Sequence, residues 1–287
     1  MKTAIMTDTN SGISPEEAEA LGIFVIPMPV IIEQKTYYEG QNLTEQEFYE
    51  ALTSRKAVST SQPSPGDVMD MWDKIIQSLN YDQLVYIPMS SGLSHSCEVS
   101  MSLAHDYEGK VFVADNHRVS VTLRDSVLHA KKLADTGLSG SEIKKALEDD
   151  AYNSSIYISV NTLEFLKKGG RITPAAAMIG SVLNIKPILT IQGEKLDSFA
   201  KARSMRRCED RMLDALRTEL EGRFCNQDLS KLKVGAAGAG LTEEEIKAWK
   251  NAVVEAFPGA EVYYNPLSAS IGCHTGPGAV GIGISFR

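Results

Sequence analysis

Cysteine is scarce in this chain, and its few cysteines lie far apart. Secreted disulfide-rich domains and structural zinc sites both rely on closely spaced cysteine pairs such as CxxC. The lack of such pairs excludes a disulfide framework and indicates a reducing, cytoplasmic location. The four cysteines are Cys97, Cys208, Cys225 and Cys273.

Positive charge is also in short supply. The chain has 29 Lys and Arg residues against 37 Asp and Glu residues, which gives a formal net charge of -8. Binding to nucleic acid requires a surplus of cations that neutralises phosphates. The composition therefore excludes a general nucleic-acid binder, and any site for an anion must be built locally.

Long hydrophobic runs are missing as well. The longest, 21–32, is interrupted by Gly22, Pro27 and Pro29 and is shorter than the roughly 20 residues of a membrane-spanning helix. It predicts a strand, a turn and a second strand. The N-terminal residues reach a polar loop at Thr7 before the apolar region of a signal peptide could form. We therefore expect no secretion signal and a cytoplasmic protein.

Apolar content and length, by contrast, are ample. A hydrophobic share of 43% in 287 residues favours two domains, since one core typically serves about 100 to 200 residues. In the first half, continuous apolar strands alternate with amphipathic helices, which predicts a parallel sheet with helices on both faces. In the second half, parallel and antiparallel signals are mixed. We predict an α/β protein with domains 1–153 and 154–287.

The strands and helices expected in the two halves follow different orders. In the first half we expect strands over 3–6, 24–31, 83–88 and 111–114, and helices opening at residue 14 and over 44–54, 67–79, 94–105 and 119–136. In the second half we expect strands over 156–160, 233–237, 261–264 and 281–286, a hairpin over 188–199, and helices over 162–168, 174–183, 205–220 and 242–256.

Hydroxyl side chains are concentrated in two loops that precede predicted helices. Capping explains one or two of them, but not so many. In a parallel α/β domain both loops can meet at the carboxyl edge of the sheet, where helix N-termini favour anions. The residues are Thr60, Ser61 and Ser64 in one loop and Ser90, Ser91, Ser94 and Ser96 in the other.

A glycine pair places one arginine at the boundary of a helix. Gly169 and Gly170 can close a helix in a conformation with positive φ and let another group approach closely. Arg171 follows them directly, so it does not lie on an ordinary solvated helix face. We therefore consider Arg171 a candidate receptor for an anion, with a structural salt bridge as the alternative.

Other residues could indicate a metal site or a catalyst. His95, His105, Asp115 and His117 lack the spacing of a HExxH motif, so we expect no metal. Asp8 at a strand end could serve phosphate transfer, although an Asp there commonly holds the N–H groups of its loop. A hydrolase or phosphotransferase that uses Asp8, Ser94 or His274 remains the alternative function.

Several motifs, in the same order along the whole chain, resemble those of the DegV family, the bacterial fatty-acid-binding proteins of the FakB type. The match includes a C-terminal glycine-rich element as well as the loops described above. The matching segments are 7–9 (TDT), 26–28 (IPM), 60–64 (TSQPS), 90–94 (SSGLS), 163–172 (LEFLKKGGRI), 183–187 (LNIKP) and 272–278 (GCHTGPG).

This resemblance implies a two-domain α/β fold with a long-chain fatty acid bound between the domains and no cofactor. The carboxylate would lie against Thr60 or Ser61 and against Ser91 or Ser94. Arg171 and His274 would lie near the head group. A partner fatty acid kinase would phosphorylate the bound carboxylate to an acyl phosphate, so that this protein is a carrier and not the catalyst. A transient contact with the membrane surface is a further expectation.

Two departures from the family pattern lie near these loops. The chain has His95 and Ser96 where the family commonly reads Gly-Thr, and Asn116-His117 follow Asp115 where the family reads Asp-Ser. We expect His95 to modulate the head group, the binding pH or the acyl preference, while Ser96 retains a hydroxyl.

Basic residues also cluster after residue 200 in this otherwise acidic chain. A docking surface for a kinase is one interpretation, because charge complementarity raises association rates. A solvated helix face is the other, since Glu209 and Asp210 neutralise part of the charge. The candidate docking residues are Arg203, Arg206 and Arg207, with Lys201 and Arg211 beside them.

Overall fold

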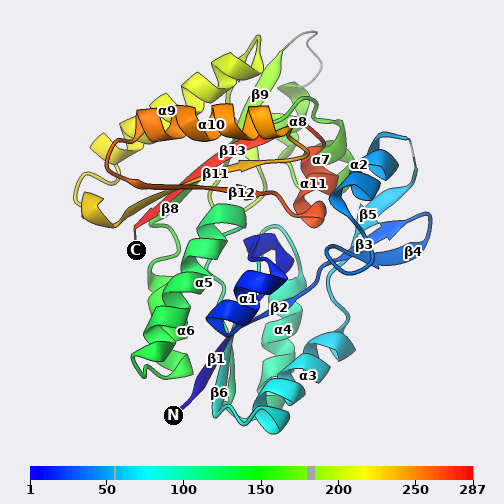
Figure 1. Cartoon of the computed structure of the whole chain (residues 1–287), viewed down its shortest axis with the longest axis vertical. Helices are drawn as coiled ribbons and strands as arrows, with labels where there is room; N and C mark the ends of the chain where they lie inside the picture. Colours follow the sequence, from blue (N-terminus) through cyan, green and yellow to red (C-terminus); the bar gives the residue numbers. More distant parts are fainter. Residues whose placement is uncertain (55, 180–184, 287) are drawn as a thin grey trace.

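The computed structural model describes residues 1–54, 56–179 and 185–286. In these residues the strands form a four-stranded sheet, a six-stranded sheet and a small three-stranded sheet (Figure 1). The four-stranded sheet belongs to the N-terminal half and the six-stranded sheet to the C-terminal half. A mixed α/β architecture with one parallel and one mixed sheet is the class that the sequence predicts.

The four-stranded sheet is entirely parallel, with the order β2-β1-β6-β7. Its strands are apolar on both faces because helices cover both. Ile5 packs in the core shared with α5 and α6, while Ala4 and Met6 pack in the core shared with α3 and α4. The strands are β1 (Thr3–Asp8), β2 (Ile23–Ile26), β6 (Gln83–Ile87) and β7 (Val111–Val113). The helices are α1 (Pro15–Leu21), α3 (Pro65–Asp73), α4 (Ser96–Ala104), α5 (Ser120–Asp135) and α6 (Gly140–Asp149).

A small antiparallel sheet projects from this half and carries α2 (Glu45–Thr53). Thr44 caps this helix, since its side chain and that of Glu47 form a capping box. The sheet itself is not predicted from the sequence, because its strands are short and partly exposed. Its strands are β3 (Pro29–Ile32), β4 (Lys35–Tyr38) and β5 (Val58–Thr60), in the order β4-β3-β5.

The six-stranded sheet has the order β10-β9-β8-β13-β11-β12 and is antiparallel except for the β11–β12 pair. Helices α9 and α10 cover its outer face (Figure 1). The strands are β8 (Ser154–Ser159), β9 (Lys186–Ile191), β10 (Asp197–Ala202), β11 (Leu232–Gly238), β12 (Glu261–Pro266) and β13 (Val280–Phe286). The helices are α7 (Glu164–Gly169), α8 (Pro174–Ile179), α9 (Met205–Glu221), α10 (Glu243–Ala256) and α11 (Ala269–Thr275).

Short helical turns complete the described elements. Three are 3-10 turns, at Thr9–Ser11, His105–Tyr107 and Leu229–Lys231, and a π turn at Lys74–Ser78 extends α3.

Most predicted elements are present, and the predicted hairpin is β9 and β10. Two helices, α6 and α11, were not predicted, and α4 begins two residues later than expected. The end of the helix predicted over 174–183 lies outside the described residues. The change of sheet between β7 and β8 is compatible with a domain boundary at residue 153, which stays our proposal.

Candidate functional site

A cavity lies between the two halves. Its walls come from the six-stranded sheet, from α5, α7 and α11, and from loops at the carboxyl edge of the parallel sheet. Most of its lining is apolar: Met28, Met89, Leu93, Val119, Val121, Ile156, Ile158, Leu166, Ile191, Leu196, Ala237, Leu267, Ile271 and Ile282. The polar lining residues are Thr60, Ser61, Gln62, Ser94, Ser120, Arg171, Ser270, His274 and Thr275.

Polar residues from distant parts of the chain meet at one end of this cavity. His274 Nε2 lies 2.9 Å from Thr60 Oγ1. The same imidazole packs on Gly169, and Arg171 Nη1 donates to the Gly169 carbonyl at 2.5 Å. Arg171 Nε donates to the Leu93 carbonyl at 3.1 Å, next to Ser94. These contacts bring Thr60, Ser94, Arg171 and His274 together in one polar cluster, which we call the head site.

His274 is held in this cluster by close packing. A Cβ atom on Gly169 would lie 2.0 Å from His274 Nδ1, so only glycine leaves room for the ring. Burial, and secondarily the charge of Arg171, lower the pKa of His274 to about 4. The ring is therefore neutral at pH 7.

The hydrogen bonding of His274 indicates its tautomer. Nδ1 is buried and has no hydrogen-bond partner among the described atoms. A buried N–H without an acceptor is costly, so we assign the proton to Nε2, which then donates to Thr60 Oγ1. The Thr60 hydroxyl is thereby left to donate its own proton toward the cavity.

Arg171 supplies the positive charge of the head site. Gly170 has φ 69° and closes α7 as a left-handed cap, as the sequence predicts. Of the described residues that line the cavity, Arg171 alone carries a permanent charge. An anion at this end of the cavity would therefore meet one guanidinium, a neutral imidazole and several hydroxyls.

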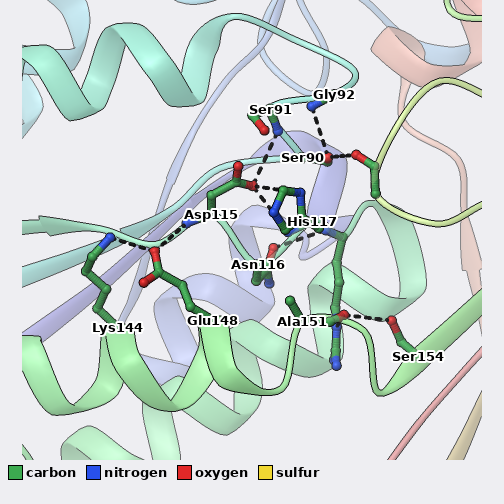
Figure 2. Close-up of polar contacts among 12 residues, drawn as sticks. Ser90, Ser91, Gly92, Asp115, Asn116, His117, Lys144, Glu148, Ala151 and Ser154 are labelled. Carbon is green, nitrogen blue, oxygen red and sulfur yellow. Dashed lines mark hydrogen bonds and ion pairs between the residues drawn. The ribbon is translucent and has the colours of Figure 1, made fainter.

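The predicted serines do not all reach the cavity. Ser61 and Ser94 line it, and their hydroxyls also make local contacts: Ser61 Oγ donates to the Gln62 carbonyl at 3.0 Å, and Ser94 Oγ accepts from Ser96 N at 3.2 Å. Ser91 is not among the described lining residues. Its N–H faces Asp115 Oδ1 at 3.4 Å instead, on the side of the loop shown in Figure 2.

Polar contacts hold the loop that carries Ser94 (Figure 2). Ser90 Oγ donates to the Gly193 carbonyl in the β9–β10 hairpin and accepts from Gly92 N at 3.2 Å. Asp115 Oδ1 also accepts from His117 N at 3.2 Å. Asn116 and His117, which differ from the family pattern, therefore lie in the segment that holds this loop and not in the cavity wall.

The other departure points away from the cavity. The His95 side chain is 85% exposed, and its Nδ1 lies 3.1 Å from Glu98 Oε2. Ser96 is buried in the first turn of α4. Neither is among the described residues that line the cavity, so modulation of the ligand by His95 would have to be indirect.

Sequence reasoning named His274 but missed Ser270 and Thr275 on α11, because the segment was interpreted as a glycine-rich element and not as a helix. Ser270 lies four residues before His274, and all three residues line the cavity. Thr275 Oγ1 is buried without a hydrogen-bond partner among the described atoms. A helix assignment from the Ser268 cap would have placed these residues on one face.

Asp8 lies outside the cavity and serves its own loop. Its carboxylate accepts from Asn10 N at 2.9 Å and from Met89 N at 2.8 Å. Burial raises the pKa of Asp8 to about 6, against these hydrogen bonds, which lower it. This arrangement favours the structural interpretation of Asp8 over a role as a nucleophile.

Within the described residues, no three or more His, Cys, Asp and Glu side chains gather as a metal ion would require. None of their helices combines the length and the apolar character that crossing a bilayer demands.

The arginine cluster lies at the start of α9, on the outer side of the six-stranded sheet. Arg203, Arg206 and Arg207 are exposed, and Arg206 contacts Glu209 at 3.8 Å and Asp210 at 3.6 Å. The cavity borders the other face of that sheet.

Comparison with known proteins agrees with this architecture. Residues 2–287 match the model of a family described as "Uncharacterised protein, DegV family". The chain therefore belongs to the DegV family. A DegV domain-containing protein of Deinococcus radiodurans is 30% identical over 285 residues, which cover 99% of this chain and 98% of that protein.

Two solved structures are similar over the whole of both chains. One is described as showing fatty acid binding of a DegV family protein from Thermus thermophilus, with a TM-score of 0.89 and 29% identity. The other is DegV from Bacillus subtilis, described as a fatty acid binding protein, with a TM-score of 0.86 and 28% identity. Each covers 100% of this chain and is covered completely by it.

Proposed function

We propose that this protein binds a long-chain fatty acid in the cavity, with the carboxylate in the head site and the acyl chain along the apolar walls. The observation that carries the proposal is the division of the lining: one end holds Arg171, His274 and hydroxyls, and the rest is mostly apolar, with Ser120 beside Val121 as a polar exception. The descriptions of the two similar structures support it.

The free energies are of the right order for such a ligand. Burial of about fifteen methylenes at ~0.8 kcal/mol each offers roughly 12 kcal/mol of gross driving force. Dehydration of the carboxylate costs several kcal/mol, which hydrogen bonds to the charged group offset at roughly 1.5 to 3 kcal/mol each. Loss of free motion on binding consumes much of the remainder. A tight but reversible complex is the expected result.

We further propose that the protein presents the carboxylate to a fatty acid kinase in the cytoplasm and is not itself the catalyst. Hydroxyl donors at Thr60 and Ser94, and at Ser61 once its hydroxyl turns away from the Gln62 carbonyl, can hold one carboxylate oxygen and leave the other free to attack a phosphate. Arg171 would then neutralise charge that accumulates during phosphoryl transfer. Asp8 is occupied by its loop and does not line the cavity, so it does not supply a nucleophile there for the enzyme alternative.

The proposal is tested by what the protein holds and by what it prefers. Organic extraction of the purified protein, followed by mass spectrometry, should release about one fatty acid per chain. Direct titration should then show that the free acid binds at least tenfold more tightly than its methyl ester. Equal affinity for acid and ester would contradict a carboxylate in the head site, and failure to bind either would contradict the function.

A further inference from the structure

The part of the cavity remote from the head site is formed by α5 and by small residues of the six-stranded sheet. Strand pairing arranges these small residues in two neighbouring rows across the sheet. Since residues two apart in a strand face the same side, both rows face the cavity side. The first row is Ile156, Gly283 and Gly235, and the second is Ile158, Gly281 and Ala237.

Val121 fills the space that the glycines of the first row leave. A Cβ atom on Gly235 would lie 2.4 Å from Val121 Cβ, and one on Gly283 would lie 2.8 Å from Val121 Cγ2. Both distances are shorter than real Cβ contacts allow. Val121 is 2% exposed and also lines the cavity, so its side chain closes the cavity over this row.

The second row remains open. A Cβ atom on Gly281 would meet the Tyr157 carbonyl oxygen at 3.4 Å and Ile158 Cγ1 at 3.7 Å, which are ordinary contacts. Gly281 and Ala237 both line the cavity. Space for an acyl chain therefore exists over the second row. In the first row, Val121 closes the space over Gly235 and Gly283, whereas Ile156 still lines the cavity.

The surroundings of Val121 fix its position. The Val121 carbonyl accepts from Tyr263 Oη at 2.9 Å, which ties α5 to β12. Just before it, His117 and Ser120 have φ of 54° and 55°. Between them, Arg118 is buried, and its Nε donates to the Ala151 carbonyl at 3.1 Å. Because these contacts hold Val121 in place, its side chain limits the length of the acyl chain and does not move aside for it.

We propose that Val121 sets the length of the acyl chain that this protein prefers, an inference that rests on the proposed binding of fatty acids. Each further methylene buried in the cavity raises the affinity about fourfold. The gain stops when the end of the chain meets Val121. The plot of affinity against chain length therefore has a break, and the volume at position 121 decides where the break lies.

The test measures Kd for saturated fatty acids of about ten to about twenty carbons with delipidated full-length protein. Two-carbon steps locate the break, and one-carbon steps then resolve it. Val121→Ala removes two carbons from the wall, so the break should move to chains longer by about one or two methylenes. Gly281→Ala adds a carbon over the second row without a clash, so the break should move to shorter chains. It also keeps the test decisive should Val121→Ala be unstable.

Val127→Ala is the matched control. Val127 lies on the same helix, is 0% exposed and is not among the described cavity-lining residues. This variant should lose stability but keep the break of the wild type. Breaks at one chain length in the wild type, Val121→Ala and Gly281→Ala would overturn the assignment while leaving fatty-acid binding intact. A wild type that binds no fatty acid would overturn the proposed function as well.

Discussion

The two ends of the cavity are built by different means. The head site collects Thr60, Ser94, Arg171 and His274 from four separate segments, and individual hydrogen bonds hold the cluster together. The far end is a regular sheet with small residues, closed by one helix. Hydrogen bonds and charge determine which group the head site binds, whereas the available volume determines which chain fits at the far end. Changes at the head site should therefore alter affinity, pH dependence and chemistry, and changes at the far end should alter only which chain fits.

The largest expected effect at the head site is a dependence on pH. The His274 pKa is about 4 in the folded protein and about 6.5 when unfolded, so the unfolded chain binds more protons between these values. The contribution of neutral His274 is complete above about pH 6.5 and is lost as the pH falls. Relative to His274→Gln, which does not titrate, the wild type should lose about 3 kcal/mol by pH 4.

Urea unfolding of both proteins at pH 7 and pH 4 measures this change, since contributions from other groups are common to both. His95→Gln is the matched control, because His95 is exposed and solvent screens its pairing with Glu98. For each variant, the difference in free energy of unfolding from the wild type is compared at pH 7 and pH 4. If this difference changes with pH by the same amount in His274→Gln and His95→Gln, His274 is not held neutral by burial.

The next effect concerns Arg171. Removal of a cation that stabilises developing charge typically costs about a hundredfold in rate, whereas its share in binding a carboxylate is about tenfold. Arg171→Ala should therefore reduce acyl-phosphate formation by a purified fatty acid kinase subunit more than it reduces affinity for the fatty acid.

Exposed Arg217, which pairs with Asp214 at 2.9 Å, provides the control substitution Arg217→Ala. It should leave both measurements near the values of the wild type. Equal losses of rate and affinity in Arg171→Ala would assign the arginine to binding alone.

The substitution Gly169→Ala should distinguish the roles of the two ends most directly, because it alters the head site alone. Gly169 is not among the residues with positive φ, so the backbone accepts alanine, but the new Cβ would displace the His274 ring. Overpacking of this kind costs about 1 to 3 kcal/mol. We expect affinity for all fatty acids to fall about thirtyfold, with no change in the preferred chain length.

Gly66→Ala is the control for this substitution, because its Cβ would contact only Ser64 Oγ within 4 Å, at 3.7 Å. Isothermal titration with the same series of fatty acids measures both properties. A shift of the preferred length in Gly169→Ala would show that the two ends are coupled and would contradict the comparison.

The sequence predicted the far end less well than the head site, for a physical reason. Hydroxyl-rich loops and the Gly-Gly-Arg boundary are local patterns, so Thr60, Ser94 and Arg171 could be selected without knowledge of the fold. The space that Val121 fills depends on the register of β11 and β13, because this register places Gly235 beside Gly283. These two strands are separated along the chain by α10, β12 and α11. No local pattern distinguishes Gly235 or Gly283 from a glycine required by a turn.

The different directions of the Ser91, Ser94 and His95 side chains have a related cause. Ser91 and His95 lie beside Ser94 in sequence, but the turn that precedes α4 directs their side chains differently. Ser94 faces the cavity, Ser91 lies toward Asp115, and His95 points into solvent. Motif membership identified the loop correctly, whereas the direction of each side chain follows from the backbone of the turn.

The smallest expected effect lies outside both ends, at the arginines on α9. Arg206 and Arg207 occupy the first turn of this helix, where the helix dipole disfavours cations, and no acidic residue is present there. Among the described helices, α1, α2, α4, α6, α7 and α10 carry glutamates in that position. Because the cations oppose the helix dipole, with only the contacts of Arg206 to Glu209 and Asp210 in compensation, we propose a docking role that would act mainly on the association rate.

Reversal of Arg203 and Arg206 to Glu should therefore slow phosphorylation of the bound fatty acid about three- to tenfold at low ionic strength, with no change in lipid affinity. The difference should shrink as added salt shortens the range of the charges to about 10 Å at 0.1 M. The helix itself should tolerate the reversal, since Glu at residue 206 suits its dipole. Reversal of exposed Lys132 and Lys145 on α5 and α6 changes the net charge equally and provides the control. Steering by a specific patch depends on the position of the charges and not only on the total charge. Equal rates for both double variants and the wild type at low salt would therefore make the cluster an ordinary solvated face.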